Sequence, residues 1–481
     1  SVILLMVLAR KTISAINSLL SFRNLCSPNL KQISTKASLT EPRTMKLDSP
    51  AFKALFTPEM ERLADIFERR GHEIRIAGGS VRDLLMDIKP ADVDFATIAT
   101  PTQMKEMFEA ESIRMLNKKG EEHGTITCRI NDKENFEVTT LRIDVVCDGR
   151  RAEVKFTTDW MEDAYRRDLT VNSLFLGLDG TVYDYTNGIE DIKKRRVAFV
   201  GDPVVRLQED YLRILRYFRF FGRIAKSPTE HEEKTIEAII KCKDGLKNIS
   251  GERLWMELHK ILVGRFAASV MEVMLTKCGL NSYLALPADA NVSEFQRVAE
   301  TNINPETEKV DAEPSTVLSA LFNDASQAQE FQRRMKCSNN ERFLIEFIVQ
   351  HRDQALAHKD DIMFFKLLIL DEIFAGNNDI KEFARQRCIE LLKYINSKTH
   401  IPLIRDWEIE IFPIHGKMLI DAGVKKGPII RNVMKYLFEL WKKSNLTATA
   451  DELLTHCHDD FELEPEDRSR KPKSHRKRTH S

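Results

Sequence analysis

The sequence predicts an α/β region that extends to about residue 200, followed by a region built almost wholly of helices. Up to that point, short segments alternate apolar and polar residues with the period of two that is typical of strands. Beyond Pro203 the apolar residues recur with the 3.6-residue period of amphipathic helices, and strand signals are few. Apolar residues make up 42% of the 481 residues and charged residues 30%, which indicates a soluble globular protein rather than a disordered chain.

The overall composition sets few further limits on function. A chain of this length corresponds to roughly three domains. The 73 basic and 73 acidic residues give a net charge of zero, which does not exclude nucleic acid, because such binding depends on clustered basic residues. The eight cysteines are scattered without a C-x-x-C pair or a zinc-type spacing, so we expect reduced thiols in a reducing compartment.

The first 40 residues have the composition of a mitochondrial transit peptide. They contain no acidic residue, five basic residues and seven serines. The apolar run from Val2 to Ala9 is too short to span a membrane, and its positive charges follow it, the reverse of a secretory signal. We expect a mitochondrial leader over residues 1–44. A second start at Met45 would give a form for the cytoplasm and nucleus, and replacing Met45 while measuring the cytosolic protein tests this.

Local patterns predict the elements of the α/β region in order. Apolar residues from Phe52 to Phe67 predict a helix that Gly71 ends, and a strand is expected at residues 74–77. Residues 100–103, Thr-Pro-Thr-Gln, are a capping box with proline at the first helical position and predict a helix to about residue 110. Further strands are expected at 113–116, 124–130, 135–142 and 152–157, and a loop at 301–315.

A glycine turn follows the first predicted strand. Gly78 and Gly79 precede Ser80, and a helix is expected to open near Val81. Two glycines let the backbone pass close to a bulky anion, and the amides at a helix N-terminus favour phosphate. Taken alone, such a turn is more often only a tight turn.

Two carboxylates come next. Asp92 and Asp94 lie two residues apart in a segment that alternates like a strand, so both are predicted on one face, with Val93 and Phe95 turned to the core. Glu137, in the alternating stretch 136–142, would add a third carboxylate, or is an exposed strand residue. His123 precedes it and is expected to be structural or loop-facing, because no second metal ligand lies at a suitable spacing. Carboxylates beside a phosphate-binding turn suit Mg²⁺ that holds a nucleoside triphosphate.

These motifs together resemble the DNA polymerase β-type nucleotidyltransferase superfamily. The form Gly-Gly-x-Val-Arg-Asp-Leu-Leu at residues 78–85 resembles one branch, the class II tRNA nucleotidyltransferases and the bacterial-type poly(A) polymerases. The resemblance implies that Asp92 and Asp94 bind Mg²⁺ and, with Glu137, form the catalytic set. It further implies that the amides after Gly78 and Gly79 help to hold the triphosphate.

A second motif, Arg-Arg-Asp-Leu-Thr-Val-Asn at residues 166–172, also resembles that family. A guanidinium can neutralise triphosphate charge and donate to two oxygens at once, which suits Arg167 together with Arg82. Asn172 suits a sugar hydroxyl, and Asp168 belongs to the same motif. The alternative is a surface Arg-Asp pair. The later stretch Asp184–Ile192 also resembles a family motif, and we interpret it as a structural turn into a helix.

A third motif occupies residues 209–220, where arginines recur every third residue on a predicted helix. Asp210 lies three residues before Arg213 and is expected on the same helical face. An aspartate can accept from an exocyclic amine while an arginine donates to ring acceptors, so such a pair can read a base edge. The stretch resembles the base-selecting motif of class II enzymes, which implies that Asp210 and Arg213 select C and then A, with Arg216 and Arg219 supporting the site or contacting phosphate. A salt-bridged amphipathic helix is the alternative.

The resemblance implies an elongated molecule: a polymerase β-like head (residues 45–200), a helical neck (201–265), a helical body (266–395), a helical tail domain (396–460) and a basic disordered end (461–481). It implies Mg²⁺-dependent addition of CCA to the 3′ end of tRNA from CTP and ATP, by a monomer or homodimer without a membrane anchor, with basic helical faces on the tRNA backbone. The alternatives are a bacterial-type poly(A) polymerase and a non-catalytic tRNA-binding protein. The isolated His458–Asp459 pair is not expected to bind metal, because further ligands are missing nearby.

Overall fold

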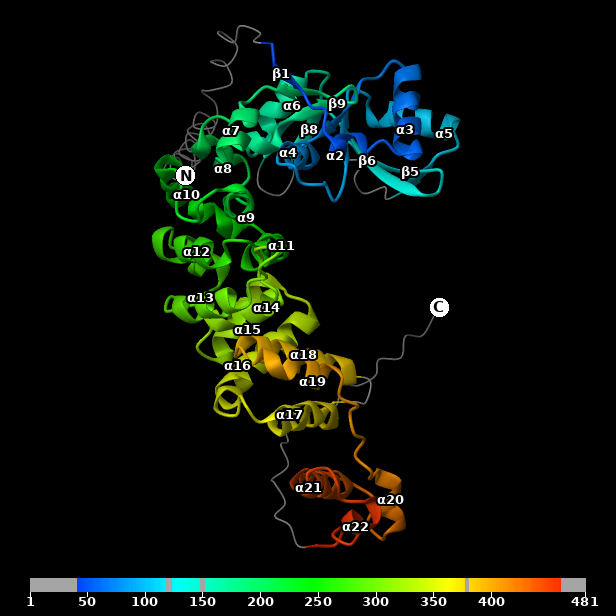
Figure 1. Ribbon diagram of the computed structural model, residues 1–481, viewed down its shortest axis with the longest axis vertical. Coiled ribbons are helices and arrows are strands. Elements are labelled where there is room, and N and C mark those ends of the chain that lie inside the picture. Colours follow the sequence, from blue (N-terminus) through cyan, green and yellow to red (C-terminus); the bar gives the residue numbers. More distant parts are fainter. Residues whose placement is uncertain (1–40, 117–120, 122, 148–151, 377–379, 460–481) are drawn as a thin grey trace, which may run out of the picture. The chain divides into compact units, whose positions relative to one another are not determined.

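The computed structural model describes residues 41–116, 121, 123–147, 152–376 and 380–459 (Figure 1). These residues form two compact units. The first contains the described residues up to Ala290 together with Asn304–Val310 and Glu330–Cys337. The second contains Asn291–Ile303, Asp311–Gln329 and the described residues from Ser338 onward. The expected leader (except residues 41–44) and the basic end beyond residue 459 lie outside the described residues.

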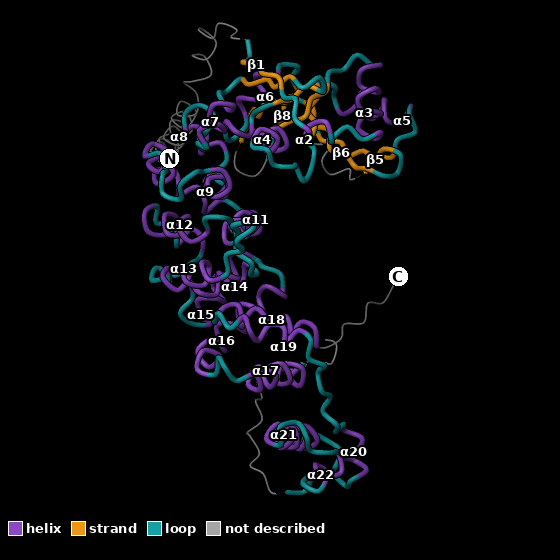
Figure 2. The backbone as a smooth tube through the Cα atoms, viewed as in Figure 1, coloured by secondary structure: helices purple, strands orange, loops and turns teal. Residues whose placement is uncertain are grey.

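All described strands belong to the first unit, where they gather at one end (Figure 2). Eight of them form one sheet in which only β3 and β6 run parallel to each other, while β7 (Arg142–Cys147) and β8 (Ala152–Phe156) form a separate antiparallel pair. In spatial order the sheet contains β1 (Arg43–Lys46), β10 (Thr181–Asp184), β9 (Phe175–Gly177), β2 (Ile74–Ala77), β3 (Asp94–Thr97), β6 (Glu134–Thr140), β5 (Thr125–Ile130) and β4 (Arg114–Leu116).

Helices complete the first unit. Those that accompany the sheet are α2 (Pro50–Lys53), α3 (Pro58–Arg69), α4 (Gly79–Leu85), α5 (Pro101–Ala110), α6 (Trp160–Arg166), the 3₁₀ turn η3 (Thr170–Asn172) and α7 (Gly188–Lys194). After β10 the described residues contain no further strand, and the first unit continues with helices α8 (Pro203–Glu209), α9 (Arg213–Ile224), α10 (Glu233–Cys242), α11 (Gly251–Leu262) and α12 (Ala267–Glu272). The predicted order of an α/β region followed by a helical region is therefore confirmed, with the last strand ending at Asp184.

The second unit is helical in its described residues. Its helices are α13 (Val292–Thr301), α14 (Pro314–Leu318), α16 (Asn339–Ala357), α17 (Ile362–Ala375), α18 (Lys381–Tyr394), α19 (Ile401–Arg405), α20 (Gly416–Asp421), α21 (Ile429–Lys443) and α22 (Ala450–Leu454), while α15 (Ala325–Met335) contributes residues to both units. In the part of the chain that is described, no helix is both long enough and apolar enough to span a bilayer.

Several local predictions are confirmed. Strand β2 has the expected limits, α4 opens two residues before Val81, and α5 starts with the expected capping box between Thr100 and Gln103. The expected helix over 52–67 is wrong as a single element, because α2 ends at Lys53 and α3 begins at Pro58. The Thr57 hydroxyl caps α3 by accepting from the Met60 amide at 3.1 Å, and a proline at the first position cannot continue a preceding helix.

Strand β1 corrects the expected boundary of the leader. It pairs antiparallel with β10, with Arg43 opposite Asp184 and Thr44 opposite Tyr183. Residues 43 and 44, which we assigned to the leader, therefore belong to the sheet, and Met45 lies within an edge strand rather than before the fold.

An aromatic cage attaches α6 to the sheet. The Arg75 guanidinium on β2 lies 4.0 Å from the ring centroid of Trp160 and 3.7 Å from that of Tyr183, and Arg75 is buried. The Trp160 indole also donates to Glu73 Oε2 at 2.9 Å. Cation–π contacts of a desolvated arginine are among the stronger side-chain contacts, so the start of α6 is held firmly against β2. The contacts of Trp160 thereby orient α6, which ends at Arg166 and leads directly into Arg167.

The turn after β10 holds η3 in place, as the structural interpretation of this motif predicted. The Asp184 carboxylate accepts from the backbone amides of Thr186, Gly188 and Ile189 at 2.9–3.0 Å. A Cβ on Gly188 would lie 2.3 Å from the carbonyl oxygen of Thr170, so α7 approaches η3 more closely than any other residue would allow.

We predict that Gly188→Ala destabilises the fold by about 1–3 kcal/mol, because either α7 or η3 must move to admit the methyl group. The melting temperature should fall by several degrees. The matched control is Gly222→Ala within α9, where the nearest atom to the added Cβ lies at 3.8 Å and alanine is the better helix former. That variant should melt at or above the wild-type temperature. Equal melting of wild type and Gly188→Ala would contradict the close approach.

Candidate active site

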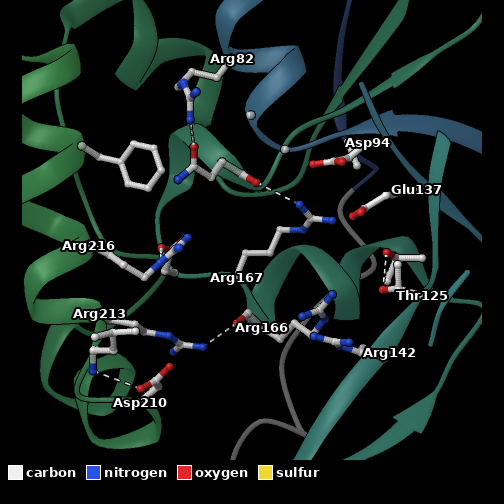
Figure 3. Close-up of a pocket in the computed structure, with 18 of the residues that line it drawn as sticks. Arg82, Asp94, Thr125, Glu137, Arg142, Arg166, Arg167, Asp210, Arg213 and Arg216 are labelled. Atoms are coloured by element: carbon white, nitrogen blue, oxygen red, sulfur yellow. Dashed lines mark hydrogen bonds and ion pairs between the residues drawn. The ribbon is translucent and has the colours of Figure 1, made fainter. Parts of the chain in front are cut away.

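One cavity of about 590 Å³ in the first unit brings the three predicted motifs together. Its walls come from the β2–α4 turn, from β3 and β6, from the segment between α6 and η3, and from α9. In Figure 3 the side chains of Asp94 and Glu137 lie on one side, those of Asp210, Arg213 and Arg216 lie opposite, and Arg167 extends between them.

The glycine turn lies directly over two arginines. Gly78 has φ +68°, and a Cβ there would come within 3.0 Å of Arg167 Nη1. A Cβ on Gly79 would lie 3.5 Å from Arg82 Nη2. Both glycines and both arginines line the cavity, and the absence of side chains on the glycines lets the guanidinium groups lie against the turn. This arrangement fits the binding of a phosphate chain.

Asn172 links these two arginines. Its side-chain oxygen accepts from Arg82 Nη1, and its backbone carbonyl accepts from Arg167 Nη1 at 3.1 Å. Arg82 is buried and also donates to Asp83, and burial is the main cause that lowers its pKa from the ordinary value. The Asn172 Nδ2 group is buried without a hydrogen-bond partner. An orphaned amide donor that lines the cavity fits a ligand oxygen, such as the sugar hydroxyl expected from the sequence.

Asp163 anchors the arginines of the second motif. Arg167 Nε and Nη2 donate to its Oδ2 at 3.1 and 3.0 Å, and Arg166 Nε donates to Oδ1 at 2.8 Å. Although burial alone would raise the pKa of Asp163, Arg167 and Arg166 hold it below the ordinary value. The sequence analysis missed this residue. Its spacing of three and four residues before the arginines on α6 is the signal that could have found it.

The carboxylates of the first motif meet at adjacent strands. Asp94 opens β3 and lies opposite Glu137 in the parallel register of β3 and β6. The prediction that Asp92 also belongs to the strand is wrong, because it lies in a bend two residues earlier and is not among the residues that line the cavity. Phe95 is buried as expected. Desolvation first, and then the charges of Glu137 and Asp92, raise the pKa of Asp94.

A buried serine ties these carboxylates to the glycine turn. Ser80 Oγ donates to the carbonyl oxygen of Asp92 at 2.9 Å and accepts from the amide of Asp94 at 3.4 Å. The two parts of the motif are thus connected directly, twelve residues apart in sequence.

No set of three or more acidic, histidine or cysteine side chains within the described residues is arranged to hold a metal ion. The donor chemistry nevertheless fits Mg²⁺, which prefers one or two carboxylates together with substrate phosphate oxygens rather than an all-protein cage. Burial raises the pKa of Asp94 most, and the nearby charges of Glu137 and Asp92 add to this effect, so a bound cation would favour the ionised carboxylate here.

The third motif is placed differently from the prediction. Asp210 does not share a helical face with Arg213, since it has an extended backbone (φ −151°, ψ 106°) between α8 and α9. Asp210 Oδ1 accepts from the Leu212 amide at 3.1 Å, which turns the chain into α9. Arg213 is nearly buried and donates to Glu209 Oε2 at 2.5 Å and to the carbonyl of Arg166 at 3.0 Å. Asp210 and Arg213 still line the same cavity.

The remaining arginines of α9 contact acidic residues of other segments. Arg216 Nε donates to Asp168 Oδ2 at 2.6 Å, and Arg216 and Arg213 hold the pKa of buried Asp168 below its ordinary value against the opposing effect of burial. Arg219 forms an ion pair with Glu257 at 3.1 Å and, unlike Arg216, is not among the residues that line the cavity. Phe220, which the sequence analysis missed, lines it instead, with the guanidinium carbons of Arg82, Arg216 and Arg219 at 5.0, 5.5 and 4.4 Å from its ring centroid. Its position seven residues after Arg213 places it on the same face of α9.

Two histidines for which no metal binding is expected lie in loop and turn contacts. The backbone carbonyl of His123 accepts from Arg142, and His458 Nε2 contacts the carbonyl of Ala422 at 2.9 Å. The described cysteines (128, 242, 278, 337, 388 and 457) are all free thiols, as expected.

Two family models match the chain. The model of the poly A polymerase head domain matches residues 74–198, and that described as the probable RNA and SrmB-binding site of polymerase A matches residues 230–287. Among solved structures, the fold is similar to the CCA-adding enzyme of Bacillus stearothermophilus in complex with CTP, with a TM-score of 0.64 and 22% identity, covering 85% of this chain and 97% of that one. The CCA-adding enzyme of Thermotoga maritima complexed with tRNA gives a TM-score of 0.58 and 19% identity, covering 86% and 98%.

Curated relatives are much closer in sequence. The mitochondrial CCA tRNA nucleotidyltransferase 1 of Mus musculus is 46% identical over 413 residues, which cover 86% of this chain and 93% of that protein. The protein of the same name from Homo sapiens is 46% identical over 416 residues, with the same coverage. Because this identity extends across both the α/β region and the helical region, the chain belongs to the family of CCA tRNA nucleotidyltransferases.

Proposed function

We propose that this enzyme adds C, C and A in turn to the 3′ end of tRNA, using CTP and ATP and releasing diphosphate. The observation that carries the proposal is that one cavity contains carboxylates, anchored arginines and an Asp-Arg pair suited to a base edge. The relatives that are 46% identical are named for this activity, and the solved structures of similar fold include complexes with CTP, with ATP and with tRNA.

Asp92 and Asp94 would hold Mg²⁺ between the protein and the triphosphate, with Glu137 adjacent. Bound Mg²⁺ supplies a lowered pKa at the primer 3′-hydroxyl and stabilises the charge of the leaving diphosphate. Arg82 and Arg167, beneath the glycine turn, would bind triphosphate oxygens, and the free Asn172 amide would donate to the sugar. Ser80 keeps the carboxylates in register with this anion site, so that the α-phosphate and the attacking oxygen are aligned.

Asp210 and Arg213 would read the base. Cytosine and adenine both present an exocyclic amine beside a ring acceptor, whereas uracil presents a carbonyl oxygen at the position of the cytosine amine. A carboxylate accepts from the amine and repels the carbonyl, while a guanidinium donates to the ring acceptor. Since Arg213 is engaged by Glu209 in the nucleotide-free protein, it must exchange this partner to contact a base. Arg216 and Arg219 support the pair from α9.

A second cavity suits the tRNA backbone. It has a volume of about 570 Å³ and is lined by Lys247, Arg253, Arg333, Arg334 and Lys336, with no acidic residue in its lining. Part of it falls within the segment matched by the RNA-binding family model. We propose that the basic face of the helical region contacts phosphodiester groups here, within the predicted neck and body.

The poly(A) polymerase alternative uses the same head, and the head-domain model carries that name. The high identity to CCA-adding relatives over most of the chain favours CCA addition instead. The non-catalytic alternative is disfavoured because the carboxylates, the glycine turn and the arginines all line or adjoin one cavity. We further propose a mitochondrial location, since the relatives are named mitochondrial, with a form from Met45 for the cytoplasm and nucleus.

The direct test supplies a tRNA transcript that ends before CCA, with Mg²⁺ and each nucleotide triphosphate singly and then CTP with ATP. We expect extension by two residues with CTP alone and by three with both, followed by arrest. A long ladder from ATP alone would instead identify a poly(A) polymerase. Absence of extension with intact tRNA binding would identify a binding protein.

Replacing Asp94 by asparagine should abolish addition and leave tRNA binding largely intact. Because a carboxylate whose pKa is raised in the folded state destabilises that state when ionised, Asp94→Asn should also melt higher than wild type in metal-free buffer at neutral pH. Mg²⁺ should stabilise the wild type more than the variant. The control is Asp87→Asn, at an exposed position whose backbone conformation asparagine tolerates; it should change neither nucleotide addition nor tRNA binding.

Equal loss of addition and tRNA binding would indicate that Asp94 is structural. Asp92→Ala should behave like Asp94→Asn in addition and binding.

Replacing Asp210 by alanine should reduce the preference for CTP over UTP by about tenfold or more, because one good contact to a base edge contributes about 1–3 kcal/mol. The ratio of kcat/KM for the two nucleotides measures this. An unchanged ratio would remove Asp210 from base selection.

A further inference from the structure

The carboxylate of Asp210 is held from two directions. Its Oδ1 accepts from the Leu212 amide at 3.1 Å, and its Oδ2 accepts from Arg253 Nη2 at 3.0 Å. The first contact belongs to the link between α8 and α9. The second comes from a different helix, 43 residues further along the chain. Each oxygen keeps one acceptor lone pair, so the two contacts decide which way the remaining lone pairs point.

Arg253 projects from a firmly seated helix. It lies in the first turn of α11, whose residues Leu254, Leu258 and Leu262 are fully buried. A Cβ on Gly251 would lie 1.8 Å from the carbonyl oxygen of Arg334, so the start of α11 is packed directly on that backbone. The position of Arg253 is therefore set by helix packing, whereas Asp210 sits in an irregular link that has no regular hydrogen-bond ladder.

The Asp210–Arg253 contact is suited to orientation rather than to stability. The two side chains are 30% and 43% exposed, and ion pairs of this exposure contribute roughly 0–1 kcal/mol to folding. The neighbouring arginines are already engaged, Arg213 by Glu209 and Arg216 by Asp168. Arg253 thus contacts Asp210 without competing for the acidic partners that anchor the rest of the cavity.

We propose that Arg253 is a positioning residue for base selection, which orients the Asp210 carboxylate so that its free lone pairs face the exocyclic amine of the incoming base. The proposal rests on the base-reading role proposed above for Asp210. Arg253 also lines the second, basic cavity, so a direct contact with RNA phosphate is the competing role. A positioning role would affect the ratio of kcat/KM for CTP to that for UTP, whereas an RNA contact would affect KM for tRNA.

The test measures kcat/KM for CTP and for UTP, and KM for tRNA, with Arg253→Gln and Arg253→Lys. We expect Arg253→Gln to lower the CTP-to-UTP ratio roughly threefold to fivefold, as the loss of one partly exposed ion pair allows. KM for tRNA should change little, because Lys247, Arg333, Arg334 and Lys336 remain in the basic cavity. Arg253→Lys, which keeps the cation, should recover most of the ratio. Adding Arg253→Gln to Asp210→Ala should cause no further loss, because Arg253 acts through that carboxylate.

The matched control is Lys260→Gln, which removes a cation from an exposed position on the same helix and should leave the ratio unchanged. An unchanged ratio in Arg253→Gln, beside a lowered ratio in Asp210→Ala, overturns the positioning role and leaves the base-reading function intact. An unchanged CTP-to-UTP ratio in both Arg253→Gln and Asp210→Ala overturns the positioning role of Arg253 and the base-reading role of Asp210. A raised KM for tRNA with an unchanged CTP-to-UTP ratio overturns the proposal in favour of an RNA contact, and a full further loss in the double variant shows that Arg253 acts independently of Asp210.

Discussion

The site depends on one electrostatic constraint: each arginine that lines the proposed nucleotide cavity is fixed by a protein acceptor. Seven arginines line the cavity, namely Arg82, Arg142, Arg166, Arg167, Arg213, Arg216 and Arg253. Their acceptors are the carboxylates of Asp83, Asp163, Glu209, Asp168 and Asp210, the Asn172 side chain and the carbonyl of His123. Without these anchors, like charges at such density would repel one another and turn outward to solvent. Arg82 and Arg167 each use all three guanidinium nitrogens in such contacts, so the anchors fix the plane of both groups at the cavity wall.

This anchoring explains why the sheet and the helices following it form one functional unit. The acceptors come from α4, α6, α8, the α8–α9 link, the segments around η3 and the segment before β5, while α11 supplies both Arg253 and the acceptor Glu257, which pairs with Arg219. A displacement of any one element would detach an arginine and leave a buried carboxylate such as Asp163 unpaired, which is costly in a low-dielectric environment. Arg82 and Arg167 are consequently oriented in advance of the proposed triphosphate, whereas Arg213 must release Glu209 to make the proposed base contact.

The sequence contained most of the local features. The limits of β2, the capping box of α5 and the turn at Asp184 follow from backbone hydrogen bonds between residues a few positions apart, and such bonds leave a clear pattern. The break at Asp210 could not be predicted, because the spacing of residues 209–220 is equally compatible with one continuous helix. The contacts of Ser80 with Asp92 and of Arg253 with Asp210 join segments 12 and 43 residues apart, so they depend on how the elements pack rather than on local periodicity. Asp163 and Phe220 are intermediate cases, since helical spacing to known motif residues would have located them.

The edge strand β1 has a consequence for how the polypeptide is matured. Arg43 and Thr44 cover the outer hydrogen-bonding row of β10, and the Arg43 guanidinium also donates to Asn187 in the turn that leads to α7. A chain shortened beyond Arg43 would leave part of that row open to water, and an uncovered strand edge is a template for pairing with another copy. The form proposed to start at Met45 lacks both Arg43 and Thr44 and keeps only the pairs of Met45 with Val182 and of Lys46 with Thr181, so we expect its β10 edge to be less covered than that of a chain cut upstream of Arg43.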